Sequence, residues 1–204
     1  MKRFLCGVLA ALMLVVLCAC GKQETATVRL SEVTHSVFYA PQYVALEQGF
    51  FADEGLNIEL TNGGGADKVM TALISGDADI GFMGSEASIY VYQQGSDDYA
   101  VNFAQLTQRA GNFLVGREAQ DNFTWADLKG KKVLGGRAGG MPEMVFEYIL
   151  KKNGIDPAAD LTIDQSINFG LTAAAFTSND ADYTVEFEPF ATGLEKEGNG
   201  HVIA

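Results

Sequence analysis

Polar and aromatic side chains recur where predicted strands give way to predicted helices, and these residues could contact a ligand. The first such stretch contains Ser36, Phe38 and Tyr39, and the second contains Gly63 and Gly64. A serine hydroxyl donates hydrogen bonds, aromatic rings stack on flat ligands, and glycines let the backbone approach a ligand closely. We predict that both stretches bind a small molecule; a core position for Phe38 and a flexible turn for the glycines are the alternatives.

A third stretch, from Gly84 to Glu86, lies directly before a predicted helix. Ser85 is placed to cap that helix with its hydroxyl. Glu86 follows in the first turn, near the positive end of the helix dipole. We expect Gly84, Ser85 and Glu86 to contact a ligand, and the alternative for Glu86 is an acid that only stabilises the helix end.

A fourth stretch combines exposed backbone N–H groups with one cation. Arg137 is the one basic residue on these loops, and its alternative role is a solvated surface side chain. A glutamate, Glu188, follows a later predicted strand. The remaining candidates are Gly139, Gly140 and Met141 on the Arg137 loop, and Gln108 between the two halves of the chain.

The elements that must position these residues alternate between strands and helices, which predicts βαβ units and a parallel sheet. Ligands bind such sheets beyond the carboxyl ends of the strands, where the candidate residues lie. Near residues 108–112 the alternation begins again, which predicts a second α/β unit. Predicted strands are 27–33, 56–60, 78–83, 101–108, 112–115, 132–135, 161–164, 183–187 and 201–204; predicted helices are 40–51, 67–75, 85–94, 124–130, 141–153, 170–178 and 190–197.

The first 19 residues have the pattern of a secretory leader. A basic start at Lys2 and Arg3 precedes an apolar run, 4–17, that is too short for the roughly 20 residues of a membrane span. The alternative is an uncleaved anchor helix. The ending Leu17-Cys18-Ala19-Cys20 resembles the lipobox of bacterial lipoproteins, which implies that Cys20 carries the lipid.

Composition excludes several kinds of function. All 3 cysteines, Cys6, Cys18 and Cys20, lie in or next to the leader, so the domain after it has no disulfide and no internal thiol nucleophile. The formal net charge of −12 disfavours a nucleic-acid partner. The 2 histidines, His35 and His201, are far apart, and no metal site or cofactor is expected.

Four motifs resemble solute-binding proteins of ABC transporters, in the NMT1/THI5-like group that handles nitrate, sulfonates, taurine and thiamine-pyrimidine precursors. The most specific is Gly49-Phe50-Phe51-Ala52-Asp53-Glu54-Gly55-Leu56. The others are the opening 36–45, Ser75-Gly76-Asp77-Ala78-Asp79-Ile80-Gly81, and Trp125-Ala126-Asp127-Leu128-Lys129-Gly130-Lys131-Lys132-Val133.

The resemblance implies a type II periplasmic-binding-protein fold, an α/β fold with two lobes and a hinge that trap a solute between them. It implies a leader at 1–19, a tether at 20–26, a first lobe at 27–109 and a second lobe at 110–204. Since the family runs longer and returns to its first lobe, we expect the second lobe and that return to be incomplete. Implied partners are the solute, a permease and an ATPase, for a monomer anchored by lipid on the outer face of the cell membrane.

Charge balance among the candidate residues bears on the solute. The loops provide one arginine against Glu86, Glu186 and Glu188. Aromatic rings and acids suit a neutral or cationic heteroaromatic such as an aminopyrimidine, and suit a sulfonate, taurine or nitrate less well. Two other functions stay open: a pyrimidine-synthesising enzyme of the same group, whose cysteine-rich motif the chain lacks, and a membrane-tethered sensor or adaptor.

Overall fold

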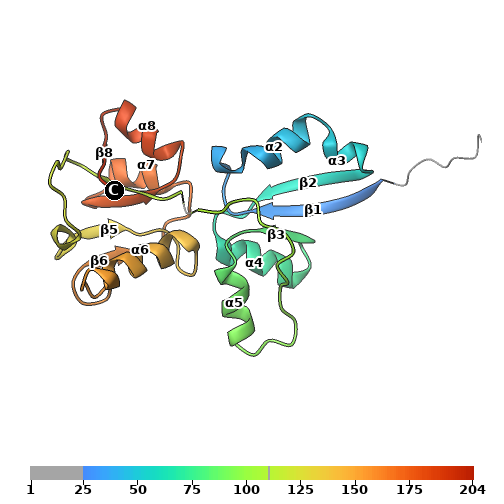
Figure 1. Cartoon of the computed structure of the whole chain (residues 1–204), viewed down its shortest axis with the longest axis horizontal. Coiled ribbons are helices and arrows are strands. Elements are labelled where there is room, and N and C mark those ends of the chain that lie inside the picture. Colours follow the sequence, from blue (N-terminus) through green and yellow to red (C-terminus); the bar gives the residue numbers. More distant parts are fainter. Residues whose placement is uncertain (1–24, 110) are drawn as a thin grey trace, which may run out of the picture.

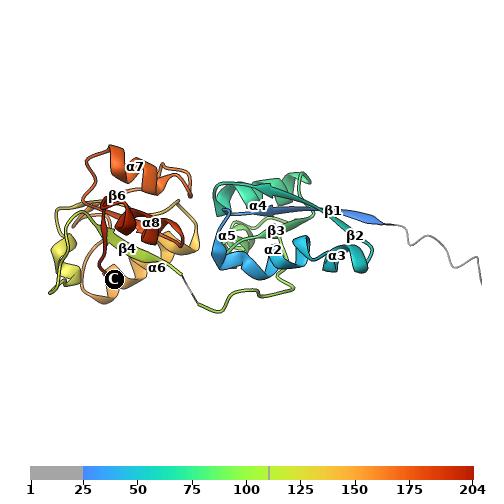
Figure 2. The ribbon, with the colours of Figure 1, turned by 90° about the horizontal axis from the view of Figure 1, so that it is seen from above.

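The computed structural model describes residues 25–109 and 111–204, so the leader and Cys20 lie outside the described residues. Two separate sheets, each with its own helices, lie side by side (Figures 1 and 2). We call the part from β1 to α5 lobe 1 and the part from β4 to β8 lobe 2. Within the described ranges, no helix is both long and apolar enough to cross a membrane.

Lobe 1 is built on a parallel three-stranded sheet with the order β2-β1-β3. Figure 1 shows α2 and α3 on one side of this sheet and α4 and α5 on the other. The elements are β1 (Ala26–Glu32), the 3-10 turn η1 (Val37–Tyr39), α2 (Ala40–Glu47), α3 (Phe50–Asp53), β2 (Leu56–Asn62), α4 (Ala66–Ser75), β3 (Ile80–Phe82) and α5 (Glu86–Gln93).

Two expectations for lobe 1 were wrong. The helix predicted over 40–51 is two helices, because Gly49 adopts a left-handed φ of 77° between α2 and α3. The strand predicted over 101–108 does not form, and β3 pairs only with β1 among the described strands. Without a neighbour to pair with, the extended segment leaves Val101 and Phe103 exposed at 74% and 77%.

Lobe 2 contains a five-stranded sheet with the order β6-β5-β7-β4-β8. Strands β5, β6 and β7 are parallel, as predicted, whereas β4 runs antiparallel to both β7 and β8. The elements are β4 (Phe113–Gly116), the 3-10 turn η2 (Trp125–Leu128), β5 (Lys132–Leu134), α6 (Met141–Lys152), β6 (Thr162–Asp164), α7 (Thr172–Ser178), β7 (Tyr183–Glu186), α8 (Phe190–Lys196) and β8 (His201–Val202).

The antiparallel β4 corrects the prediction of a wholly parallel sheet. This strand enters from lobe 1 through an extended connection, so no helical crossover fixes its direction. The helix α8 connects β7 to β8 and leaves β4 between them.

Alternating side chains divide the core of lobe 2 between the two faces of its sheet. Leu114 and Val133 pack with Phe146 and Leu150 of α6, whereas their neighbours Val115 and Leu134 pack with Phe176 of α7. The helix α6 begins with Pro142 in its first turn, and its last turn carries Lys151 and Lys152. The packing of Phe146 and Leu150 on the sheet leaves the first turn of α6, with Met141 and Pro142, at the edge that faces lobe 1.

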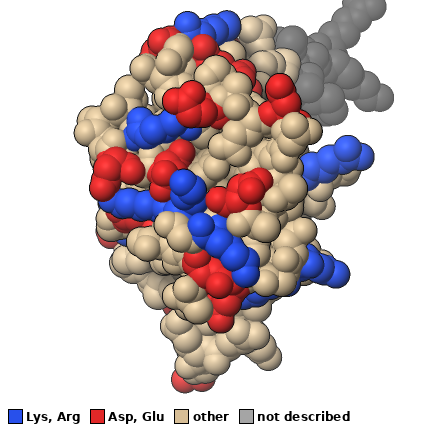
Figure 3. All heavy atoms as spheres, turned by 90° about the vertical axis from the view of Figure 1, so that its left-hand side faces the viewer, with Lys and Arg blue, Asp and Glu red and all other residues tan. Residues whose placement is uncertain are grey.

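The outer end of lobe 2 presents both signs of charge. Figure 3 shows basic and acidic side chains interspersed on this face. Lys129, Lys131 and Lys132 pair there with Asp160, Asp182 and Asp180 respectively.

Candidate functional site

A cleft lies where the two lobes meet, at the carboxyl ends of strands from both sheets. Its volume is about 50 Å³, enough for a few water molecules and too small for an organic solute. Most of its lining is apolar or glycine. The lining residues are Val33, Tyr39, Gly65, Ala66, Gly84, Glu86, Arg137, Gly140, Met141, Pro142, Phe169 and Phe187.

Glu86 is the unusual group in this cleft. The residue is only 3% exposed, and neither carboxyl oxygen has a hydrogen-bond partner among the described residues. Burial raises the pKa of this carboxyl, and the nearby backbone N–H groups of Glu86 and Met141 oppose that rise without reaching hydrogen-bond geometry. A buried polar group without a partner is costly, so this one calls for a functional explanation.

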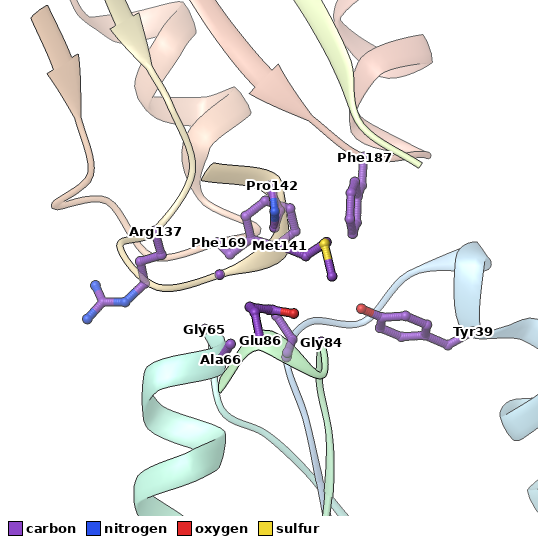
Figure 4. A pocket seen from close by; sticks show the side chains of 12 residues that line it. Tyr39, Gly65, Ala66, Gly84, Glu86, Arg137, Met141, Pro142, Phe169 and Phe187 are labelled. Atoms are coloured by element: carbon purple, nitrogen blue, oxygen red, sulfur yellow. The ribbon is translucent and has the colours of Figure 1, made fainter. Parts of the chain in front are cut away.

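Tyr39 faces Glu86 across the cleft. Figure 4 shows the Tyr39 hydroxyl and the Glu86 carboxyl pointing toward one another from η1 and α5. The Tyr39 ring packs on Phe82 with 4.4 Å between centroids, and burial raises the pKa of its hydroxyl. The hydroxyl therefore remains protonated and can donate to a solute.

Two phenylalanines of lobe 2 cover the cleft and complete the apolar core of lobe 1. Phe169 and Phe187 meet edge to face, with ring centroids 4.9 Å apart. Both pack with Val33, Val69 and other buried residues of lobe 1. Phe38 packs on Phe187 at 5.5 Å. It lies outside the cleft and lines a neighbouring groove of about 900 Å³ between β3 and 98–109.

Arg137 joins the lobes through an ion pair. Its Nη2 lies 2.6 Å from Oδ2 of Asp67, and its Nε lies 2.8 Å from Oδ1. The Arg137 guanidinium lowers the pKa of Asp67. The only cation that lines the cleft is therefore already paired, and Asp67 was not foreseen as its partner.

Ser36 and Glu188 contact each other instead of lining the cleft. The Ser36 hydroxyl donates to the Glu188 carbonyl oxygen at 2.6 Å, which fixes a second contact between the lobes. The Glu188 carboxylate accepts from the backbone N–H and the hydroxyl of Thr192. Both side chains are thus used by the fold.

Ser85 does not cap α5 as expected. Its backbone is helical (φ −64°, ψ −21°), whereas a capping residue is extended, and its hydroxyl makes no cap hydrogen bond. Its carbonyl oxygen accepts from the Ser88 hydroxyl instead. Ser85 and Gln108 both line the neighbouring groove.

The predicted glycines divide between the cleft and its surroundings. Gly84, Gly140 and the adjacent Met141 line the cleft. Gly63, Gly64 and Gly139 do not, although the Gly64 carbonyl accepts from the Phe169 N–H across the lobes. Gly65, Ala66, Pro142 and Phe187 lie within two residues of positions that were predicted to contact a ligand, whereas Val33 and Phe169 were missed. Phe169 follows β6 and precedes α7, so the same strand-to-helix rule could have found it.

No metal centre accompanies the cleft. Within the described part of the chain, no three His, Cys, Asp or Glu side chains gather as a metal site requires. His35 lies 3.0 Å from the buried Glu32 carboxylate, which also accepts from Gln42 and Tyr43.

Comparison with known proteins places this architecture in a family. The family model described as NMT1/THI5 like matches residues 37–200, most of the chain. The chain belongs to the NMT1/THI5-like family. YtlA of Bacillus subtilis, which is provisionally named a binding protein, is 52% identical over 189 residues, covering 92% of this chain and 57% of the relative.

Solved structures show that this NMT1/THI5-like chain has the periplasmic-binding-protein fold. The alkanesulfonate-binding protein SsuA from Xanthomonas axonopodis matches with a TM-score of 0.68 at 23% identity, over 89% of this chain and 61% of SsuA. The periplasmic nitrate-binding protein NrtA from Synechocystis matches with a TM-score of 0.66 at 19% identity, over 87% and 50%. The chain thus spans half to three fifths of the length of these relatives.

Proposed function

We propose that this chain is the solute-binding component of an ABC importer, in which two lobes with a boundary near residues 109–110 close on a small organic solute. One observation carries the proposal: an apolar and aromatic cleft between two α/β lobes contains a single unpartnered carboxyl, Glu86. Ligand sites are typically apolar clefts with a few convergent polar groups. Because the cleft holds only about 50 Å³, binding requires the lobes to open and close again.

An aminopyrimidine or a similar heteroaromatic is the solute class we favour. The rings of Tyr39, Phe169 and Phe187 offer apolar faces, and Glu86 can accept from an amino group. Arg137 is held by Asp67 and is not free to bind an anion. A sulfonate, taurine or nitrate is the second candidate, since relatives with the same fold are named for alkanesulfonate and nitrate binding.

Isothermal titration with 4-amino-2-methylpyrimidine and with taurine tests this solute class. We expect micromolar or tighter binding of the pyrimidine and none of taurine. Tyr39→Ala should weaken pyrimidine binding at least tenfold, whereas Tyr148→Ala, on an exposed ring of α6, should not. Tight taurine binding without pyrimidine binding would sink the proposal.

Two rival functions predict different behaviour in the same preparation. A pyrimidine-synthesising enzyme would have the aminopyrimidine as its product, so the appearance of an aminopyrimidine after incubation of the chain with histidine and pyridoxal phosphate would argue for the enzyme. A membrane-tethered sensor or adaptor would bind solute without driving transport. We expect the solute-loaded chain to stimulate ATP hydrolysis by its permease and ATPase partners in lipid vesicles.

We also propose that lipid on Cys20 holds the chain, as a monomer, at the outer face of the cell membrane. The lipobox-like ending at Cys20 supports this. Cys20→Ala should move the protein from the membrane fraction to the medium, and the matched control Cys18→Ala should leave it at the membrane. Equal release of the two variants would contradict the assignment of Cys20.

A further inference from the structure

Two helices begin at the cleft, one from each lobe. α5 begins at Glu86 and α6 begins at Met141, and both residues line the cleft (Figure 4). Neither Ser85 nor Gly140, the residues that precede these helices, provides a side-chain cap. The positive dipole ends of both helices therefore face the same space, and the backbone N–H groups of Glu86 and Met141 lie next to it, an arrangement that favours an anion.

The chain's own Glu86 carboxyl occupies that space. A Cβ added at Gly84 would overlap both carboxyl oxygens, so the side chain folds back over the loop before α5 instead of pointing to solvent. It is 3% exposed and has no hydrogen-bond partner among the described residues. The backbone N–H of Met141, the first residue of α6, faces it from the other lobe.

The remaining groups around Glu86 do not neutralise it. Among the described residues that line the cleft, Arg137 is the one basic residue. Its Nε and Nη2 donate to the two carboxylate oxygens of Asp67, and its Nη1 donates to the Asn168 side-chain oxygen. Tyr39 offers a neutral hydroxyl, and the other lining side chains are apolar. A second negative group entering the cleft would meet an unpaired carboxyl of like charge in a poorly solvated space.

We infer that Glu86 is a built-in anion between the N-termini of α5 and α6, which excludes anionic solutes and admits solutes that present an N–H donor or a cation to it. This specificity role rests on the proposed solute-binding function and narrows its solute class. The Glu86 carboxyl occupies the place where an alkanesulfonate or nitrate would bind, so this one side chain excludes both anions.

Titration of methanesulfonate and of 4-amino-2-methylpyrimidine into the wild type, Glu86→Ser and Glu86→Gln tests the inference. We expect no methanesulfonate binding to the wild type and a gain of at least tenfold in both variants. Pyrimidine affinity should fall at least tenfold in Glu86→Ser. Glu143→Gln is the matched control. Like Glu86, Glu143 is an acid in the first turn of a helix, but it lies on α6 and does not line the cleft.

Each outcome decides a separate question. A folded Glu86→Ser that fails to gain methanesulfonate binding overturns the inference, as does an equal gain in Glu143→Gln. If the wild type binds no pyrimidine while Glu86→Ser gains methanesulfonate, the solute class under the proposed function fails and the role of Glu86 stands. If circular dichroism shows Glu86→Ser to be unfolded, Gly84→Ala takes its place in the test, because the added methyl group displaces the Glu86 carboxyl without removing it.

Discussion

Glu186, at the end of β7 and next to the cleft residue Phe187, is also a buried acid, but its carboxylate has partners. The hydroxyls of Thr184 and Thr172 donate to it at 2.7 Å and 3.0 Å. Burial nevertheless raises its pKa from 4.5 to about 7. This contrast shows that hydrogen bonds from two hydroxyls offset only part of the cost of burying a carboxylate.

The raised pKa of Glu186 predicts a loss of stability as pH rises. Its folded state binds a proton more tightly than its unfolded state, so stability is full below about pH 4.5 and falls as pH rises through about 7. The complete loss is on the order of 3 kcal/mol. In urea denaturation at pH 5 and pH 8, Glu186→Gln should lose markedly less stability than the wild type. Parallel pH profiles for the two proteins would contradict this prediction.

The spacing of residues along the sequence did not reveal which side chains of the site contact each other. Tyr39, Glu86 and Met141 were found because they follow strand ends, a position that can be read from the chain. Arg137 was also found, but its partner Asp67 lies 70 residues away. Ser36 was predicted to face a ligand and instead bonds the Glu188 carbonyl, which only the folded chain brings near.

At the scale of elements, α7 holds one face of the lobe 2 sheet through Phe176. This side chain is fully buried among Val115, Leu134 and residues of α8, and the Arg117 guanidinium lies 4.4 Å from its ring centroid. Phe176→Ala should lower the free energy of unfolding by about 3 to 5 kcal/mol. Phe50→Ala, on the exposed face of α3, should change it by less than about 0.5 kcal/mol. Urea denaturation measures both, and similar losses would contradict the assigned role of Phe176.

The ion pair between Arg137 and Asp67 connects the loop before α6 to α4. It should influence how easily the two lobes separate more than it influences the free energy of unfolding. Exposed or half-exposed pairs are typically worth about 0.2 to 1 kcal/mol. Arg137→Ala should therefore enlarge the radius of gyration in small-angle scattering with little change in Tm. Arg29→Ala breaks a comparable pair with Asp79 inside lobe 1 and should leave the radius unchanged. The same radius for both variants would show that the pair does not restrain the lobes.

Elements were easier to predict than their directions. Helix α6 was anticipated within one residue at its C-terminal end, since Pro142 and Gly154 bracket an apolar periodicity. The antiparallel β4 and the missing strand at 101–108 were not anticipated. Both depend on which strand lies alongside, and local alternation of apolar residues is the same for either direction and for an unpaired segment.

At the scale of the whole molecule, the groove beside β3 leaves apolar surface open. Val101 and Phe103 flank it, and β3 pairs on only one edge within the described residues. Large apolar patches and open strand edges promote association. At low concentration, light scattering should give the monomer proposed above. At high concentration it should detect association that Phe103→Asp reduces and that Tyr148→Asp on α6 does not. A monomer at every concentration would contradict this.

The order of the strands has a consequence for how closure can be measured. Within the described residues, each lobe's sheet comes from one uninterrupted stretch of chain, so the two lobes can be regarded as receptor and ligand joined by a connecting segment. Phe169 and Phe187 are then the anchors of a protein–protein interface, with Arg137 at its rim. The connecting segment gives each lobe an effective concentration on the order of millimolar at the other, so weak contacts between the lobes are enough to hold them together. A solute that touches both lobes acts in these terms as a molecular glue, and the factor by which saturating solute tightens one lobe on the other equals the ratio of its affinities for the closed and the open states.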